Sequence, residues 1–296
     1  MNWWTLGFIL CDVVLLLTAK HFLNIQIHPY FYISIISLIV SAELLIYIKL
    51  FKKTDKNFFK LSNIKTIIPS GLLIGMASAV GFLSIKLTSA TNFALLNKTT
   101  ILISPVFAWL ILKESINILI FPIILVVLFG IWLLTGDLKM IINLSGDSLA
   151  IITTFFVALD YVYQKKATTK NSDLTVAFWR RFISALILTI LWLLTPQFGK
   201  ATINFLPWLF LISFGYFLVS IFMVKAVKSQ PIADFNLYIN ITPVIVAVMA
   251  FFLLGEKLNL IQWLGAGLIL TAIMSYNLLI KYDSRNNSGS QRVKVN

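Results

Sequence analysis

The chain has 296 residues, of which 59% are hydrophobic and 12% are charged, and its mean hydropathy is +0.92. Soluble domains carry about 25% charged residues, so this composition excludes a soluble globular protein and indicates a polytopic integral membrane protein. The single cysteine, Cys11, excludes an internal disulfide framework, and two histidines leave no zinc motif. We therefore expect no cofactor and no metal centre.

Ten apolar segments are expected to cross the bilayer as α-helices, because each has about the 20 residues that span the hydrocarbon core. The first segment has no basic region before its apolar run, so we expect it to remain as a span and not to be cleaved. The last residues, 283–296, are polar and are expected to form a disordered cytoplasmic tail. In chain order the expected spans are 3–21, 29–49, 66–87, 90–112, 116–135, 148–166, 174–195, 205–226, 231–254 and 258–281.

The loops between these segments alternate in charge. "KLFKKTDKNFFKLSNIK" carries six lysines and one aspartate, "QKKATTKNSD" three lysines and "VKAVKSQ" two, whereas the loops on the other side carry about one basic residue each. By the positive-inside rule this asymmetry predicts a multi-pass protein of the cell membrane with both termini cytoplasmic. The net charge of +13 follows from these loops and predicts contact with anionic lipid head groups, without a nucleic-acid partner.

The two halves of the chain resemble each other. A shift of 142 residues aligns "LTSATNFALLNKTTILISPVFAWLILKE" with "SQPIADFNLYINITPVIVAVMAFFLLGE" without gaps, and eight of the 28 positions are identical. Each half then holds five spans, and an odd number inverts the second half in the membrane. We predict an all-α integral membrane protein of ten transmembrane helices, built from two inverted five-helix repeats, 1–146 and 147–282. Inverted repeats are typical of secondary transporters that bind substrate near the midplane.

The second half also resembles a known family. "QPIADFNLYINITPVIVAVMAFFLLGEKLNLIQWLGAGLILTAI" is similar to the second signature of EamA-type permeases in the drug/metabolite transporter superfamily, through Pro243, Gly255-Glu256 and "WLGAGLIL". "FFVALDYVYQKKATTKNSDLTVAFWRRFISALIL" resembles the start of that family's second half. The resemblance implies a ten-helix carrier that exports or exchanges metabolites by alternating access. The first half departs from the pattern, since Ile101 stands where Pro243 has its counterpart.

Ionisable residues inside the spans are the main candidates for a substrate site, because a charge at the bilayer centre costs at least ~2.5 kcal/mol. Lys98 lies in the middle of the fourth span, and Asn240 is its repeat partner. Asp12 and Asp160 coincide under a shift of 148. The resemblance adds aromatic residues on spans that are similar to cavity-lining helices of the family. The predicted substrate-binding residues are Lys98, Asp12, Asp160, Asn240, Tyr161, Tyr163 and Trp179.

Structural roles for these charges stay open. Lys98 could pair with Asp12 or Asp160 as a structural clamp, and Asp160 could pair with Lys165 or Lys166 at the membrane interface. The long side chains of Arg180 and Arg181 are expected to reach lipid phosphates, although one of them could hold an anion in a cavity. Glu114 and Glu256 are expected to cap the next helix or pair locally. Small residues are interpreted as helix-packing positions: Gly71, Gly75, Ala79, Gly215 and Gly267.

The leading functional hypothesis is a secondary transporter, an exporter or exchanger, of a small polar, amino-acid-like metabolite. No phosphate-binding loop occurs in the sequence, so we expect coupling to a proton or a counter-substrate, with Asp12 and Asp160 as proton carriers. The alternative within transport is an exchanger of phosphorylated or nucleotide-linked anions. An integral membrane enzyme or a scaffold is the alternative from other classes, but we predict no catalytic residues. The sequence leaves open whether the protein is a monomer or a dimer.

Overall fold

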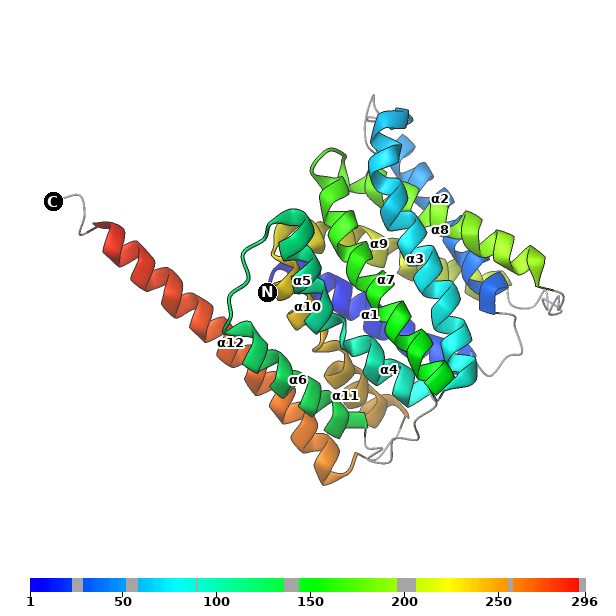
Figure 1. Cartoon of the computed structure of the whole chain (residues 1–296). Helices are drawn as coiled ribbons and strands as arrows, with labels where there is room; N and C mark the ends of the chain where they lie inside the picture. The colour runs from blue at the N-terminus through cyan, green and yellow to red at the C-terminus, as the bar shows by residue number, and fades with distance from the viewer. Residues whose placement is uncertain are drawn as a thin grey trace.

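The computed structural model describes the chain except for residues 23–28, 52–57, 89, 136–143, 196–205, 255–257 and 293–296. All regular structure in the described residues is helical (Figure 1). The helices are α1 (Trp3–Phe22), α2 (Pro29–Phe51), α3 (Leu61–Leu87), α4 (Ala90–Lys98), α5 (Thr100–Leu112), α6 (Ile120–Thr135), α7 (Leu144–Thr168), α8 (Asp173–Leu194), α9 (Leu206–Ser229), α10 (Ile232–Ile239), α11 (Thr242–Leu254) and α12 (Leu260–Arg292).

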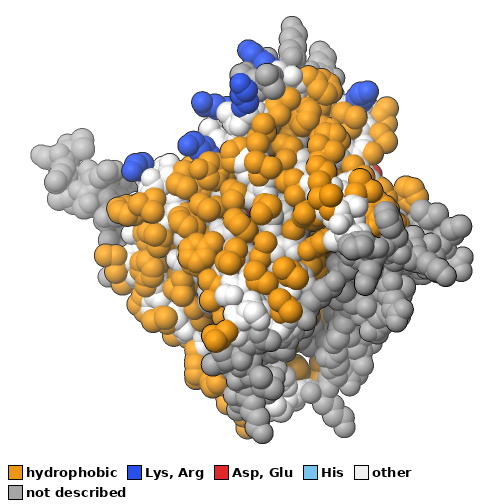
Figure 2. Space-filling view, turned by 45° about the vertical axis from the view of Figure 1, so that its right-hand side comes forward, with side chains coloured by type: hydrophobic (Ala, Val, Ile, Leu, Met, Phe, Trp, Pro, Cys, Tyr) orange, Lys and Arg blue, Asp and Glu red, His pale blue; other side chains and the backbone are white. Residues whose placement is uncertain are grey.

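Eight segments are long and apolar enough to cross a membrane, and two shorter apolar helices, Trp3–Leu15 and Ile120–Thr135, accompany them. Large apolar side chains face outward, among them Trp3 (83% exposed) and Phe252 (75% exposed). Figure 2 shows one face largely covered by such side chains, with Lys and Arg gathered along its upper edge. Lipid solvates an apolar surface of this kind, so the chain is a multi-pass membrane protein. The count of ten spans depends on the two shorter helices and stays a prediction.

The fourth and ninth expected spans are each broken into two helices. α4 ends at Lys98 and α5 begins at Thr100, while α10 ends at Ile239 and α11 begins at Thr242. Under the shift of 142 residues, Thr100 coincides with Thr242, so both repeats break at the same point. A backbone hydrogen bond between residues three apart ends α4 and α10 alike. Thr99 N donates to Leu96 O at 3.1 Å, and Asn240 N donates to Leu237 O at 3.3 Å.

Threonine hydroxyls stabilise the first of these breaks. Thr99 Oγ1 donates to Leu96 O at 2.6 Å, and Thr100 Oγ1 donates to Asn97 O at 2.5 Å. These hydroxyls satisfy carbonyls at the end of α4 that have no partner within the helix. In the second break, Pro243 occupies the first turn of α11, where its missing N–H costs little.

Equivalent helices of the two repeats make equivalent contacts with the opposite repeat. α3 of the first half packs against α7 and α8, and its repeat partner α9 packs against α1 and α2. Gly71 and Gly75 allow α3 to approach α8, because a Cβ at either position would lie 2.7–2.9 Å from Ile183 or Ile187. The packing role predicted for these two glycines is confirmed. Gly267 differs, since a Cβ there would meet nothing within 4 Å.

α6 and α12 form a separate pair at one edge of the molecule (Figure 1). Their backbones touch at Gly130 and Gly265, where a Cβ on Gly265 would lie 2.5 Å from the Gly130 carbonyl oxygen. α12 then continues past α6 as far as Arg292. The disorder expected from residue 283 stays a prediction, and 293–296 lie outside the described residues.

Candidate functional site

Two predicted site residues, Asp12 and Lys98, lie at mid-depth on helices that begin at opposite faces of the membrane. Asp12 is nine residues into α1 and Lys98 eight residues into α4, which places each roughly 12–14 Å from the start of its helix. Both side chains are half-buried. Each interacts electrostatically with the other, yet no ion pair joins them in the described part of the chain. Their charges are therefore available to a ligand.

Arg181 and Tyr216 extend this group from α8 and α9. Arg181 Nε donates to Ser220 Oγ at 2.8 Å, and the guanidinium lies 5.5 Å from the centre of the Tyr216 ring. Tyr216 is within electrostatic range of both Arg181 and Asp12. The expectation that Arg181 reaches lipid phosphates is wrong, since its side chain is held inside the bundle. Its position eight residues into an apolar span was the sequence signal for an interior role.

Asp160 is in a different environment from Asp12. It is fully buried and accepts from Arg180 Nε at 3.0 Å, from Arg180 Nη2 at 2.5 Å and from Ser70 Oγ at 2.5 Å. Arg180 is only 2% exposed, so it does not reach lipid phosphates either. The alternatives that paired Asp160 with Lys98 or with Lys165 are wrong, because Arg180 occupies both carboxylate oxygens. Asp160 therefore holds α3, α7 and α8 together.

Asn240 and Tyr161 are both buried. Asn240 is at the break between α10 and α11, where its Nδ2 donates to Asn236 O at 2.6 Å. Among the described residues its Oδ1 has no hydrogen-bond partner. The Tyr161 ring meets Phe235 edge-on at 5.3 Å, and its hydroxyl is within electrostatic range of Asp12. Both stay candidates for the substrate site.

The structure does not bring Tyr163 and Trp179 to this group. Trp179 Nε1 donates to the Phe58 carbonyl oxygen at 3.0 Å, and its ring packs among phenylalanines. Tyr163 lies beside Lys166, at 5.9 Å from ring centre to Nζ, and lines a 180 Å³ hollow with Lys170. Their aromatic type suggested a ligand, but helix packing and the membrane interface account for both.

A polar cluster joins the two halves at the end of the molecule where α1 begins. Glu114 Oε1 pairs with Lys165 Nζ at 2.5 Å, and Glu114 Oε2 accepts from Ile232 N at 2.9 Å, at the start of α10. Lys165 Nζ also donates to Gln230 O at 2.6 Å. Gln230 in turn donates to Thr5 Oγ1 at 2.7 Å. We call Glu114, Lys165 and Gln230 the interhalf clamp. Glu114 was expected to cap the next helix or pair locally, whereas it contacts the start of α10 and pairs with Lys165 of the other half. Glu256 lies outside the described residues.

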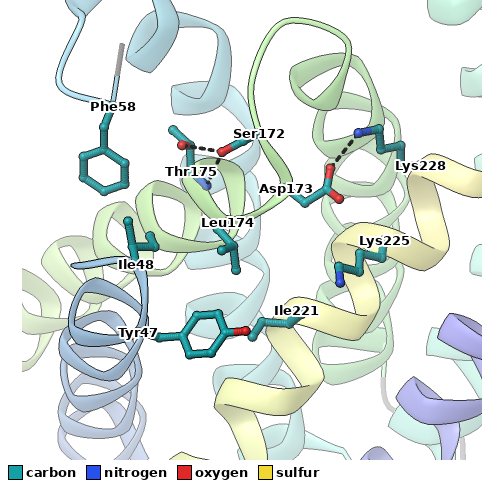
Figure 3. A pocket seen from close by; sticks show the side chains of 10 residues that line it. All are labelled: Tyr47, Ile48, Phe58, Ser172, Asp173, Leu174, Thr175, Ile221, Lys225 and Lys228. Carbon is teal, nitrogen blue, oxygen red and sulfur yellow. Dashed lines mark hydrogen bonds and ion pairs between the residues drawn. The ribbon is translucent and has the colours of Figure 1, made fainter. Parts of the chain in front are cut away.

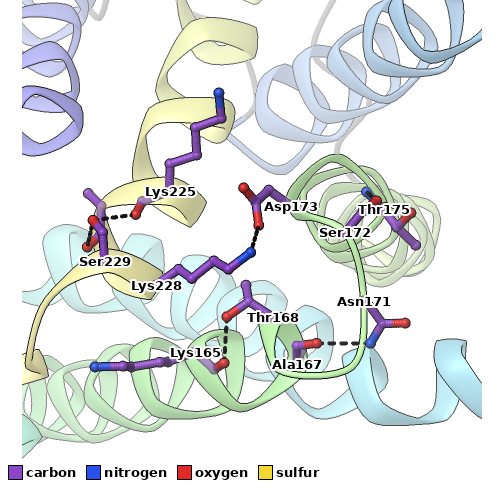
Figure 4. A network of polar contacts seen from close by, with 11 residues as sticks. Lys165, Ala167, Thr168, Asn171, Ser172, Asp173, Thr175, Lys225, Lys228 and Ser229 are labelled. Atoms are coloured by element: carbon purple, nitrogen blue, oxygen red, sulfur yellow. Dashed lines mark hydrogen bonds and ion pairs between the residues drawn. The ribbon is translucent and has the colours of Figure 1, made fainter. Parts of the chain in front are cut away.

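A hollow of 310 Å³ lies at the same end, between α2, α8 and α9 (Figure 3). Its lining combines apolar side chains such as Ile48 and Phe58 with Lys225 and Lys228. Asp173 at the start of α8 pairs with Lys228 at 2.8 Å (Figure 4). None of the predicted site residues lines this hollow. No group of three or more His, Cys, Asp or Glu side chains able to hold a metal occurs in the described residues.

The family follows from comparison with known proteins. The model of the EamA-like transporter family matches residues 2–136 and 144–278, so the chain belongs to this family of membrane transporters. An uncharacterized transporter of Archaeoglobus fulgidus is 23% identical over 215 residues, which cover 71% of this chain and 69% of that one. An uncharacterized transporter of Synechocystis is 23% identical over 244 residues, covering 77% and 68%. A solved crystal structure superimposes with a TM-score of 0.76 at 13% identity, covering 94% of this chain and 96% of the other.

Proposed function

We propose that the protein is a secondary transporter, an exporter or exchanger, of a small polar, amino-acid-like metabolite. Membership of a transporter family supports transport, and the single observation that carries the site is the relationship between Asp12 and Lys98. Two opposite charges without an ion pair lie at mid-depth on helices that enter from opposite faces. Leaving charges unpaired in the membrane is costly unless a ligand uses them.

Each charge has a role in this proposal. Lys98 binds an anionic group of the substrate, usually a carboxylate, and Asp12 binds a cationic group of the same molecule. The start of α5 directly after Lys98 adds the positive end of a helix dipole at the same depth. Broken helices at a midplane site are typical of secondary transporters. A zwitterion would satisfy both charges at once and offset their desolvation.

Alternating access requires the site to open to each face in turn. The interhalf clamp favours closure at the end where α1 begins, because it links α5 of the first half to α7 and α10 of the second half. Substrate would then reach Asp12 and Lys98 from the opposite end in this conformation. Opening at the clamp requires the Glu114–Lys165 ion pair to separate.

The experiment begins with a screen of amino acids, nucleotides and phosphate esters for compounds that raise the melting temperature of the purified protein. Compounds that do so are then assayed for uptake into proteoliposomes. Lys98→Gln keeps length and polarity but removes the charge, so binding should weaken by about 10- to 150-fold. Lys170→Gln, at an exposed lysine between α7 and α8, is the matched control and should bind normally. Normal transport by Lys98→Gln would remove Lys98 from the site.

Energy coupling is tested in the same liposomes. We propose coupling to a proton or a counter-substrate, with Asp12 as the remaining proton carrier, since Arg180 and Ser70 hold Asp160. An imposed pH gradient should accelerate uptake by the wild type and have little effect on Asp12→Asn. Equal rates with and without the gradient in both proteins would indicate exchange or facilitated diffusion without proton coupling.

A further inference from the structure

Arg181 lies eight residues into α8 and faces Ser220 and Tyr216 of α9. Among the described residues it makes no ion pair, and only its Nε has a hydrogen-bond partner, Ser220. Its neighbour Arg180 differs, since Asp160 binds both of its donating nitrogens. The two terminal amino groups of Arg181 are therefore available to an acceptor on a ligand.

The side chain is nevertheless held in one orientation. Ser220 fixes Nε at 2.8 Å and the Tyr216 ring lies 5.5 Å from the guanidinium carbon. A cation over an aromatic face is attracted to it, so the plane of the guanidinium is restrained. The fork of the two terminal nitrogens matches the paired oxygens of a carboxylate or phosphate. Arg181 is therefore preorganised for an anion.

The ionisable residues of this group are unequal in type. Lys98 and Arg181 are basic and Asp12 is acidic, when the Asp160–Arg180 ion pair is set aside. Tyr216 is within electrostatic range of both Arg181 and Asp12. Glu43, on α2, accepts from Ser213 Oγ at 2.8 Å. A ligand with two anionic groups and one cationic group would match two basic residues and one acid.

We propose that Arg181, positioned by Ser220 and Tyr216, is a second anion subsite of the central site. The inference rests on the proposed function and names the substrate class: an amino-acid-like compound with one cationic and two anionic groups. Lys98 and Asp12 bind its zwitterionic part, and Arg181 binds the second anionic group, a carboxylate or a phosphate. Neutral zwitterions leave Arg181 without an acceptor and are therefore poorer ligands.

Two matched pairs of compounds test the proposal on the purified full-length protein: L-glutamate with L-glutamine, and O-phosphoserine with serine. The first pair reports a carboxylate and the second a phosphate in otherwise similar molecules. The wild type should bind at least one anionic member about 10- to 150-fold more tightly than its neutral partner. Arg181→Gln should bring the ratio of the two affinities close to one, mainly by weakening the binding of the anionic compound. Arg181→Lys should retain part of the preference, and it serves as the readout if Arg181→Gln does not fold.

Two outcomes would overturn the inference. A wild type that binds both members of each pair equally has no second anion subsite. A variant that weakens the anionic and neutral members by the same factor shows that Arg181 supports the site without contacting substrate. Uptake measurements distinguish a failure of this inference from a failure of the proposed function. If the protein transports a neutral zwitterion and transport depends on Lys98, the proposed function holds and the second anion subsite is rejected. If transport of no tested compound depends on Lys98, the proposed function itself is rejected.

Discussion

Arg180 and Asp160 form a buried, two-point ion pair, with Nε donating to Oδ1 at 3.0 Å and Nη2 donating to Oδ2 at 2.5 Å. Ser70 of α3 donates to the same carboxylate. The pair thus joins a helix of the first half to two helices of the second. It also explains why two carboxylates that coincide in the repeats differ in role: Asp160 has a full set of donors, and Asp12 does not.

Breaking this pair should destabilise the protein. Asp160→Asn leaves the Arg180 charge buried without its counterion, so we expect a loss of about 3–5 kcal/mol in the free energy of unfolding. The double variant Asp160→Leu with Arg180→Met removes both charges and should recover most of that loss. Unfolding in detergent micelles, followed by temperature or denaturant, measures both. Asp173→Asn at the exposed Asp173–Lys228 pair is the control and should change stability by about 1 kcal/mol or less.

Glu114 makes two contacts in the interhalf clamp, an ion pair with Lys165 and a helix cap at Ile232 N, and two variants should separate their effects. Glu114→Gln keeps an oxygen for Ile232 N but loses the charge that binds Lys165, and Glu114→Ala loses both. We expect amide hydrogen exchange over residues 232–236 to rise about tenfold in Glu114→Gln. Exchange should rise further in Glu114→Ala, because loss of the cap costs about 1 kcal/mol more. Unchanged exchange in both variants would mean that α10 is held in place by packing alone.

Two nearby glycines of α12 should respond in opposite ways. Gly265→Ala places a methyl group 2.5 Å from the Gly130 carbonyl oxygen, so α6 and α12 must separate and the melting temperature should fall. Gly267→Ala meets no atom within 4 Å and should leave stability unchanged or raise it, by up to about 1 kcal/mol, through helix propensity. Thermal unfolding of the two variants side by side tests this, and similar losses in both would contradict the close contact at Gly265.

Orientation in the membrane is tested with single cysteines in a Cys11→Ser background. The lysine asymmetry predicts that Thr169, between α7 and α8, faces the cytoplasm and that Leu144, at the start of α7, faces outward. Both side chains are exposed. A membrane-impermeant maleimide should label Leu144→Cys in intact cells, and Thr169→Cys only after lysis. The reverse pattern would place both termini outside.

The sequence predicted the fold better than the site, for a physical reason. Hydropathy and the repeat register are properties of single segments, so they indicated the helical class and the equivalence of Lys98 with Asn240. The breaks at Thr99 and Asn240 were missed because hydropathy was read over whole spans, and a short polar stretch such as residues 97–100 does not lower it enough to divide a span. Partner choice depends on how helices face each other: Asp160 could have met Lys98, Lys165 or Arg180, and only the packing of α7 on α8 selects Arg180.

The pairing of α6 with α12 has a consequence for how the protein is made. α6 ends at Thr135 and α12 begins at Leu260, so the ribosome adds about 125 residues between them. α6 has few contacts with other helices, and Gly130 lies on the face that Gly265 later covers. During synthesis that face of α6 must therefore remain in contact with lipid or with an insertion factor, and the first five-helix repeat reaches its final packing only after the last helix has entered the membrane.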